Sequence, residues 1–175
     1  MAIQTRLLSA VLSVMLSVGS QLYSNIEEQP VQALYEPERA DVEYIARTLW
    51  HECRGVESTA EKAAVVWCIL NRVDNERWAN NIHDVCTEPD QFAYEPDAPL
   101  DPELMWLAED VITRWNMEND RWDDVGRTLP YDYYFFSGTG KRNWFRKEYR
   151  SSDNWDWSLP DPYAEETNEE GADAE

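Results

Sequence analysis

The stretch "AAVVWCIL", residues 63–70, constrains the fold of this chain more than any other feature. Eight consecutive apolar residues leave no polar side to face water, so a helix that contains them must be buried on nearly all sides. The residues before the stretch favour a helix start. Ser58 can cap the helix and Glu61 stands three positions later, as in a capping box. We therefore expect a central helix that continues to about Val73, with the other elements packed around it.

Two further helices are predicted around this central one. Asp41 can cap a helix that runs to about Glu52, and another helix is expected to start at Asp101 with Pro102 in its first turn. Both helices carry apolar side chains at the spacing of a core-facing stripe. The stripe residues are Val42, Ile45, Ala46, Leu49 and Trp50 in the first helix, and Leu104, Leu107, Ala108, Val111 and Trp115 in the second.

The remaining segments carry weaker signals. Short helical patterns occur in "WANNIHDVC", residues 78–86, and a loop rich in proline and acids follows. The aromatic run "YDYYFFSGTG", residues 131–140, has the composition of a strand that ends in a glycine turn. We expect "NWDWSLPDPY", residues 154–163, to be irregular and ordered through its rings.

Length and charge limit the organisation and the partners of the chain. Its 175 residues allow one compact domain with tails. A net charge of −20 is the opposite of the basic surface that a nucleic-acid binder needs, so we expect no nucleic-acid partner. A sugar polymer would be held by stacking and hydrogen bonds, for which the nine tryptophans and nine tyrosines supply flat rings.

The two ends differ in composition from the middle of the chain. Residues 1–24 carry one base, Arg6, and then an apolar run from Leu7 to Val18. That run is shorter than the roughly 20 residues of a membrane span and fits a secretory signal, with a retained amphipathic helix as the alternative. We expect a linker over 25–40, the folded domain over 41–163, and a disordered acidic tail over 164–175.

The stretch "ARTLWHECRGVE", residues 46–57, places His51, Glu52, Cys53 and Arg54 in succession and allows four interpretations. A zinc site is disfavoured because the second histidine of H-E-x-x-H is missing and no C-x-x-C occurs. A nucleophilic thiol at Cys53 needs a base within reach, for which His83 is available. The three cysteines also allow one disulfide, although Cys68 lies in the apolar stretch.

The third interpretation is a carboxyl general acid, and the fourth is ordinary packing at the end of a helix. At 100° per residue Glu52 falls about 20° from Ile45, on the edge of the apolar stripe. Partial burial of a carboxyl group against apolar side chains raises its pKa and makes it a proton donor near neutral pH. Gly55 then ends the helix and lets a substrate approach. A solvent-exposed Glu52 paired with Arg54 is equally compatible with the residues alone.

Three ordered patterns in the chain resemble the cell-wall hydrolase family typified by spore cortex-lytic enzymes. The first, A-R-x-[IVL]-[WY]-x-E-[AC]-R-G, is matched by "ARTLWHECRG" at 46–55, and the second ends in L-N-R-V, as at 70–73. The third, Q-x-x-[QA]-F, is matched at its end by Gln91 and Phe92, with Glu88 in place of the leading glutamine. The segment "YYFFSGTGKRNWF" resembles the last element of the family more loosely. The likeness covers about residues 41–160.

The resemblance implies an α+β fold, a helix-dominated domain similar to lysozymes and transglycosylases with a small β-sheet. It implies cleavage of peptidoglycan glycan strands by a lytic transglycosylase or muramidase-type reaction, with Glu52 as the catalytic acid and base. We expect a monomer that is secreted or associated with the cell wall, with no stable membrane span, no metal and no cofactor. The expected substrate-binding residues are Gln91, Phe92, Tyr94, Tyr134 and Trp144.

Several alternatives stay open at this point. The chain could be a glycan-binding module without catalysis, or a peptidase of the stem peptides that depends on Cys53. A second carboxylate could come from Asp84, Asp90 or Glu95, since no spacing singles one out. His51 stands where many relatives have glycine or alanine. We expect Asn71 and Arg72 to cap the carbonyls of the central helix.

Overall fold

The computed structural model describes residues 34–164. The expected signal at 1–24, most of the linker at 25–40 and all but the first residue of the tail at 164–175 lie outside the described residues. Within the described part, no helix combines the length and the apolar character that a membrane crossing requires.

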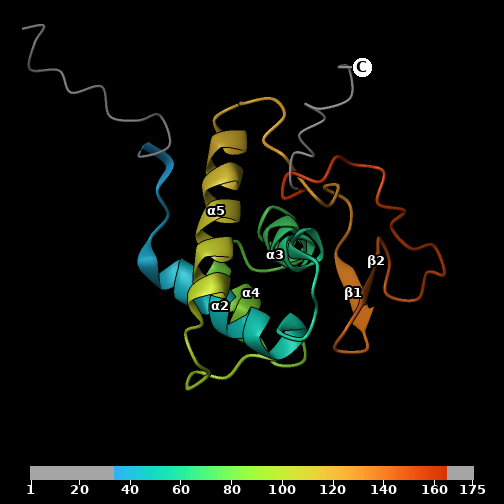
Figure 1. Ribbon diagram of the computed structural model, residues 1–175, viewed down its shortest axis with the longest axis horizontal. Coiled ribbons are helices and arrows are strands. Elements are labelled where there is room, and N and C mark those ends of the chain that lie inside the picture. Colours follow the sequence, from blue (N-terminus) through green and yellow to red (C-terminus); the bar gives the residue numbers. More distant parts are fainter. Residues whose placement is uncertain (1–33, 165–175) are drawn as a thin grey trace, which may run out of the picture. The chain divides into compact units, whose positions relative to one another are not determined.

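The described residues form helices and one small sheet, which confirms the helix-dominated α+β fold. The helices are α2 (Arg39–Cys53), α3 (Thr59–Val73), α4 (Ile82–Thr87) and α5 (Pro102–Asn119). Strands β1 (Phe135–Gly138) and β2 (Asn143–Arg146) pair as an antiparallel hairpin. In Figure 1 α3 is seen end-on, with α5 on one side of it and the hairpin on the other.

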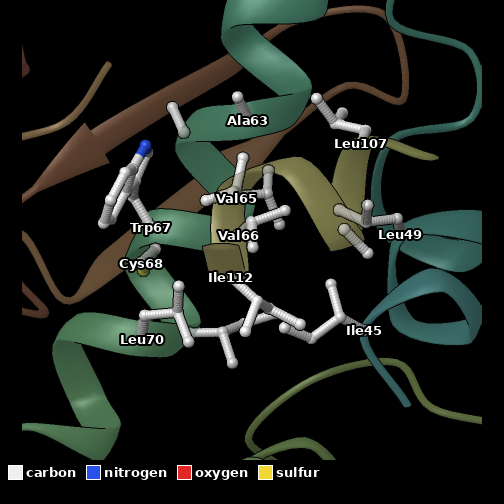
Figure 2. Close-up of a cluster of buried hydrophobic side chains, with 14 of the residues drawn as sticks. Ile45, Leu49, Ala63, Val65, Val66, Trp67, Cys68, Leu70, Leu107 and Ile112 are labelled. Atoms are coloured by element: carbon white, nitrogen blue, oxygen red, sulfur yellow. The ribbon is translucent and has the colours of Figure 1, made fainter. Parts of the chain in front are cut away.

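Helix α3 is the centre of the core, as its sequence predicts. Every residue from Ala63 to Leu70 is fully buried. Helices α2, α4 and α5 all pack against α3, and so does β1. Figure 2 shows side chains of α2 and α5 converging on Val65 and Val66; they are Ile45, Leu49, Leu107 and Ile112. Burial of this kind stabilises the fold by about 1.5–3 kcal/mol for each large aliphatic side chain.

The helix starts agree with the predictions for α3 and α5 and differ for α2. The Ser58 hydroxyl accepts a hydrogen bond from the Glu61 amide at 3.2 Å, and Asp101 accepts from the amides of Glu103 and Leu104. The capping box is only half formed, because the Glu61 carboxylate accepts from the Asn143 amide of β2 instead of from Ser58. Helix α2 begins at Arg39, two residues before the predicted cap at Asp41.

The hairpin and the segment after it lie against the core through aromatic side chains. Phe136 of β1 is paired with Phe145 of β2, and Phe145 is almost fully buried. The predicted strand is confirmed only over its later part, 135–138, and its partner β2 was not predicted. The segment at 154–163 is irregular and ordered by its rings, as expected. Trp155 packs on Tyr133 and Trp157 on Phe145, with ring centroids 5.4 and 5.8 Å apart.

Candidate active site

Glu52 lies in the last turn of α2 and is half-buried. The amide N–H of Ala93 donates a hydrogen bond of 2.6 Å to its Oε1 atom. This amide comes from the loop that follows α4, 41 residues further along the chain. Among the described residues the other carboxylate oxygen, Oε2, accepts no hydrogen bond. The carboxyl group is therefore held in one orientation, with one oxygen left for another partner.

Arg54 holds the end of α2 through the backbone. Its Nη1 donates to the Trp50 carbonyl at 2.7 Å, and its guanidinium lies 5.4 Å from the centre of the Trp50 ring. Since the last carbonyls of a helix lack partners within the helix, this bond stabilises the helix end. Arg54 forms no ion pair with an acid in the part of the chain that the structure describes, so the alternative of an exposed Glu52 paired with Arg54 is not observed.

Gly55 serves the hairpin, and the expectation that it opens space for a substrate is wrong. A Cβ atom at Gly55 would lie 2.5 Å from the carbonyl oxygen of Gly140, in the turn between β1 and β2. Gly140 itself has a left-handed backbone, with φ of +78°. The two glycines let the hairpin turn approach the end of α2 closely. The hairpin turn therefore lies against Gly55, three residues after Glu52 in the chain.

The loop that carries Ala93 is held by its other side chains. The Gln91 Oε1 atom accepts a hydrogen bond of 2.7 Å from Arg72. The Phe92 ring lies 4.4 Å from the Arg72 guanidinium and packs on Phe136, and Tyr94 packs on Tyr44. The backbone of the loop contacts Glu52, while the predicted binding side chains contact other parts of the protein.

Tyr134 and Trp144, the remaining predicted binding residues, lie in different surroundings. The Tyr134 hydroxyl accepts from Asn75 at 3.0 Å and its ring packs on Trp78, next to the end of α3. Trp144 is 38% exposed on β2. Its neighbours in the strand, Asn143 and Phe145, are buried, so Trp144 faces away from the side of the hairpin that contacts Phe92.

Asn71 and Arg72 join α3 to the segment before β1, so the expectation that they cap their own helix is wrong. Asn71 Nδ2 donates to the carbonyls of Pro130 and Tyr133 at 2.8 and 2.9 Å. Arg72 Nε donates to the Tyr134 carbonyl at 2.8 Å, and its Nη1 is the donor to Gln91. Burial lowers the pKa of Arg72. Arg72 thus links the Ala93 loop to the hairpin, a role that its sequence position did not indicate.

The three cysteines are buried and free, so the disulfide that their number allowed is not formed. Burial raises the pKa of Cys53 to about 12, and it does the same for Cys68 and Cys86. A thiol with that pKa is almost entirely protonated at neutral pH, and the thiolate is the reactive form. Within residues 34–164 no three His, Cys, Asp or Glu side chains gather as metal ligands would.

The acids considered as second carboxylates lie in three settings. Asp84 is held at the start of α4 by Asn81 and His83, with distances of 2.8 and 2.7 Å. Asp90 is exposed and has a left-handed backbone. Glu95 lies 3.7 Å from the Nε2 atom of His51, the residue before Glu52. Of the three, Glu95 is the one that the structure brings to the end of α2.

The comparisons with known proteins give one match. The model of the Cell Wall Hydrolase family matches residues 56–156, more than half of the chain. The matched part extends from the residues before α3 to the aromatic segment after β2, and it begins four residues after Glu52. No curated protein and no solved structure matches the chain.

Proposed function

Because the chain belongs to the cell wall hydrolase family, we propose that it cleaves the glycan strands of peptidoglycan, with Glu52 as general acid and base. The family accounts for a hydrolytic role at the cell wall. The choice of the glycosidic bond rests on one observation. A half-buried carboxyl group at the end of α2 is oriented by the Ala93 amide and keeps Oε2 unengaged among the described residues.

The hydrogen bond from Ala93 also fixes where the acid carries its proton. Oε1 accepts from the amide N–H at 2.6 Å, so the proton of the neutral carboxyl group resides on Oε2. Glu52 then donates this proton from Oε2 to the bridging oxygen as the bond to C1 of the sugar breaks. The positive charge that develops on the sugar ring resembles an oxocarbenium ion.

The second step distinguishes the two reaction types. In a lytic transglycosylase the C6 hydroxyl of the same sugar attacks C1, and its proton returns to Glu52, so that an anhydro sugar forms and no water is consumed. In a hydrolase a water molecule replaces the C6 hydroxyl, and a second carboxylate usually activates it or forms a covalent intermediate. We favour the first route, since Glu95, the candidate next to His51, is largely exposed.

The expected substrate-binding residues divide into two groups under this proposal. Gln91, Phe92 and Tyr94 hold the loop that presents the Ala93 amide, and Tyr134 supports the neighbouring end of α3. We propose that toward the sugar bound at Glu52 these four act by positioning. Trp144 has an exposed ring and can stack on a sugar outside the immediate surroundings of Glu52. We also propose that residues 1–24 direct export of the protein, and that it acts as a monomer.

The test is digestion of purified peptidoglycan followed by mass spectrometry of the products. The wild type is compared with Glu52→Gln, which keeps the shape of the side chain and removes the ionisable proton. Glu57→Gln is the matched control, because Glu57 is an exposed glutamate five residues further on. We expect anhydro-muropeptides from the wild type and from the control, and none from Glu52→Gln.

Other outcomes would lead to other conclusions. Products with reducing ends would indicate a hydrolase and direct attention to Glu95. Equal products from the wild type and Glu52→Gln would refute the role of Glu52. No products from any variant, combined with sedimentation of the protein with peptidoglycan, would favour the glycan-binding module. A peptidase that depends on Cys53 has little support, given the raised pKa of the buried thiol.

A further inference from the structure

A small polar pocket lies beside the loop that holds Glu52. Its volume is about 230 Å³, and it is lined by Arg77, Trp78, Ala79, Val85, Glu88 and Gln91. Gln91 is two residues from Ala93, whose amide binds Glu52. Two residues span about 7 Å at most, so a molecule in the pocket would lie close to a glycosidic bond that is bound at Glu52.

The pocket contains one cation and one anion that lack partners in the described structure. The Arg77 guanidinium lies over the Trp78 ring, 4.7 Å from its centre, and no carboxylate between residues 34 and 164 forms an ion pair with it. Glu88 is exposed and likewise forms no ion pair with a base of the described region.

Gln91 adds hydrogen-bond donors in a fixed orientation. Arg72 donates to Gln91 Oε1 at 2.7 Å and has no acceptor atom, so the oxygen of the amide must face Arg72. The amide nitrogen, Nε2, then carries two N–H groups that Arg72 does not engage. Arg77 and Gln91 together can donate to a carboxylate, while Glu88 can accept from an ammonium group.

We infer that this pocket binds a zwitterionic amino-acid group, one carbon atom that carries both an ammonium and a carboxylate. Ala79 and Val85 supply an apolar wall for the aliphatic chain of such a group. The volume is below the roughly 300–1,000 Å³ of most small-molecule sites and suits one amino acid better than a disaccharide. On the proposed function, on which this assignment rests, the group belongs to the peptide stem of the strand that Glu52 cleaves.

The binding test uses a ligand without sugar. The probe is the tripeptide L-alanyl-γ-D-glutamyl-meso-diaminopimelate, whose last residue carries a free ammonium and carboxylate on one carbon. Its affinity is measured by isothermal titration calorimetry with the full chain carrying Glu52→Gln. We expect Arg77→Gln and Glu88→Gln, each added to that chain, to weaken binding about tenfold. The control Arg150→Gln, which removes an exposed arginine outside the pocket, is expected to leave the affinity unchanged.

A modified ligand tests the same contact without a protein variant, in case a variant fails to fold. The tripeptide has two free amines, at the alanine and at the diaminopimelate. N-acetylation of the diaminopimelate amine alone removes the ammonium group in question and should weaken binding to the otherwise unaltered protein by a similar factor. No binding of the tripeptide, or equal affinities for Arg77→Gln, Glu88→Gln and the control, would overturn the assignment. These outcomes are independent of catalysis, because failure of the proposed function is read from the digestion products of the wild type and Glu52→Gln.

Discussion

Gly55 determines how closely the hairpin approaches the end of α2. Replacing it with alanine would put a Cβ atom 2.5 Å from the Gly140 carbonyl oxygen, so the hairpin turn must shift. We expect Gly55→Ala to lower the free energy of unfolding by about 1–3 kcal/mol, as overpacking usually does. Urea unfolding followed by tryptophan fluorescence measures this loss, and the same variant should turn over peptidoglycan more slowly.

The matched control is Glu57→Ala, a change of an exposed side chain two residues away. Its free energy of unfolding should stay within about 0.5 kcal/mol of the wild type. If Gly55→Ala were as stable as this control, the close contact between the two turns would not exist in solution.

Single residues also show where prediction of the site from sequence succeeds and fails. The place of Glu52 on the edge of the stripe follows from helical geometry, and the structure finds this side chain half-buried at the helix end. Its partner could not be predicted, because the Ala93 amide is a backbone group 41 residues away and side-chain patterns do not encode it. Gln91 and Phe92 were expected to face substrate, and their contacts with Arg72 depend on a buried cation that no local pattern indicates.

The last turn of α3 is connected by hydrogen bonds to the segment that leads into β1. Asn71 is 2% exposed, donates to two carbonyls and accepts from Arg127. Asn71→Ala would leave these buried groups without partners, so we expect it to lower the free energy of unfolding by about 2–4 kcal/mol. Denaturant titration of the purified variant provides the value.

Asn75→Ala is the control for this change, one turn further on. Asn75 donates to the Tyr134 hydroxyl at 3.0 Å and is only half-buried, so its loss should cost about 1 kcal/mol or less. A similar decrease in the free energy of unfolding for both variants would contradict this expectation. The hydrogen bonds between Asn71 and the segment before β1 would then contribute no more to stability than an ordinary surface contact.

At the level of elements, the strength of the local pattern decides what can be predicted. Helices α2, α3 and α5 carry long apolar stripes or runs, and each was predicted within about three residues of its observed start. Strand β2 has four residues, two of them the polar Asn143 and Arg146, which is too short for an alternating pattern. Its position depends on the Glu61 carboxylate and on Gly55, contacts between residues that are far apart in the chain.

The charge of the whole molecule predicts how its stability changes with pH. Burial raises the pKa of Glu61 and of Asp41, so at these groups the folded chain holds protons more tightly than the unfolded chain does. The stability that they provide is complete below their unfolded values of 4.5 and 3.8, and it is lost as the pH rises through the raised folded values. Repulsion within a chain of net charge −20 acts in the same direction.

One group opposes this trend. A hydrogen bond from Asn81 lowers the pKa of Asp84, so the stability that Asp84 provides is present above its unfolded value and is lost as the pH falls. We therefore expect the midpoint of thermal unfolding to rise as the pH is lowered from 7 to about 5, and to fall again at stronger acidity. Added salt should raise the midpoint at pH 7, because it screens the repulsion between carboxylates.

Glu61→Gln distinguishes the contribution of the buried carboxyl group to the pH dependence of stability from the contribution of the general repulsion between carboxylates. The glutamine keeps an oxygen that can accept from the Asn143 amide, and it does not titrate. Between pH 5 and 7 the free energy of unfolding should therefore depend less on pH in this variant than in the wild type, while the effect of salt should remain. An unchanged pH dependence would assign the trend to Asp41 and to repulsion over the surface, without a contribution from Glu61. In that case the contact between Glu61 and β2 would hold the hairpin equally well at every pH in this range.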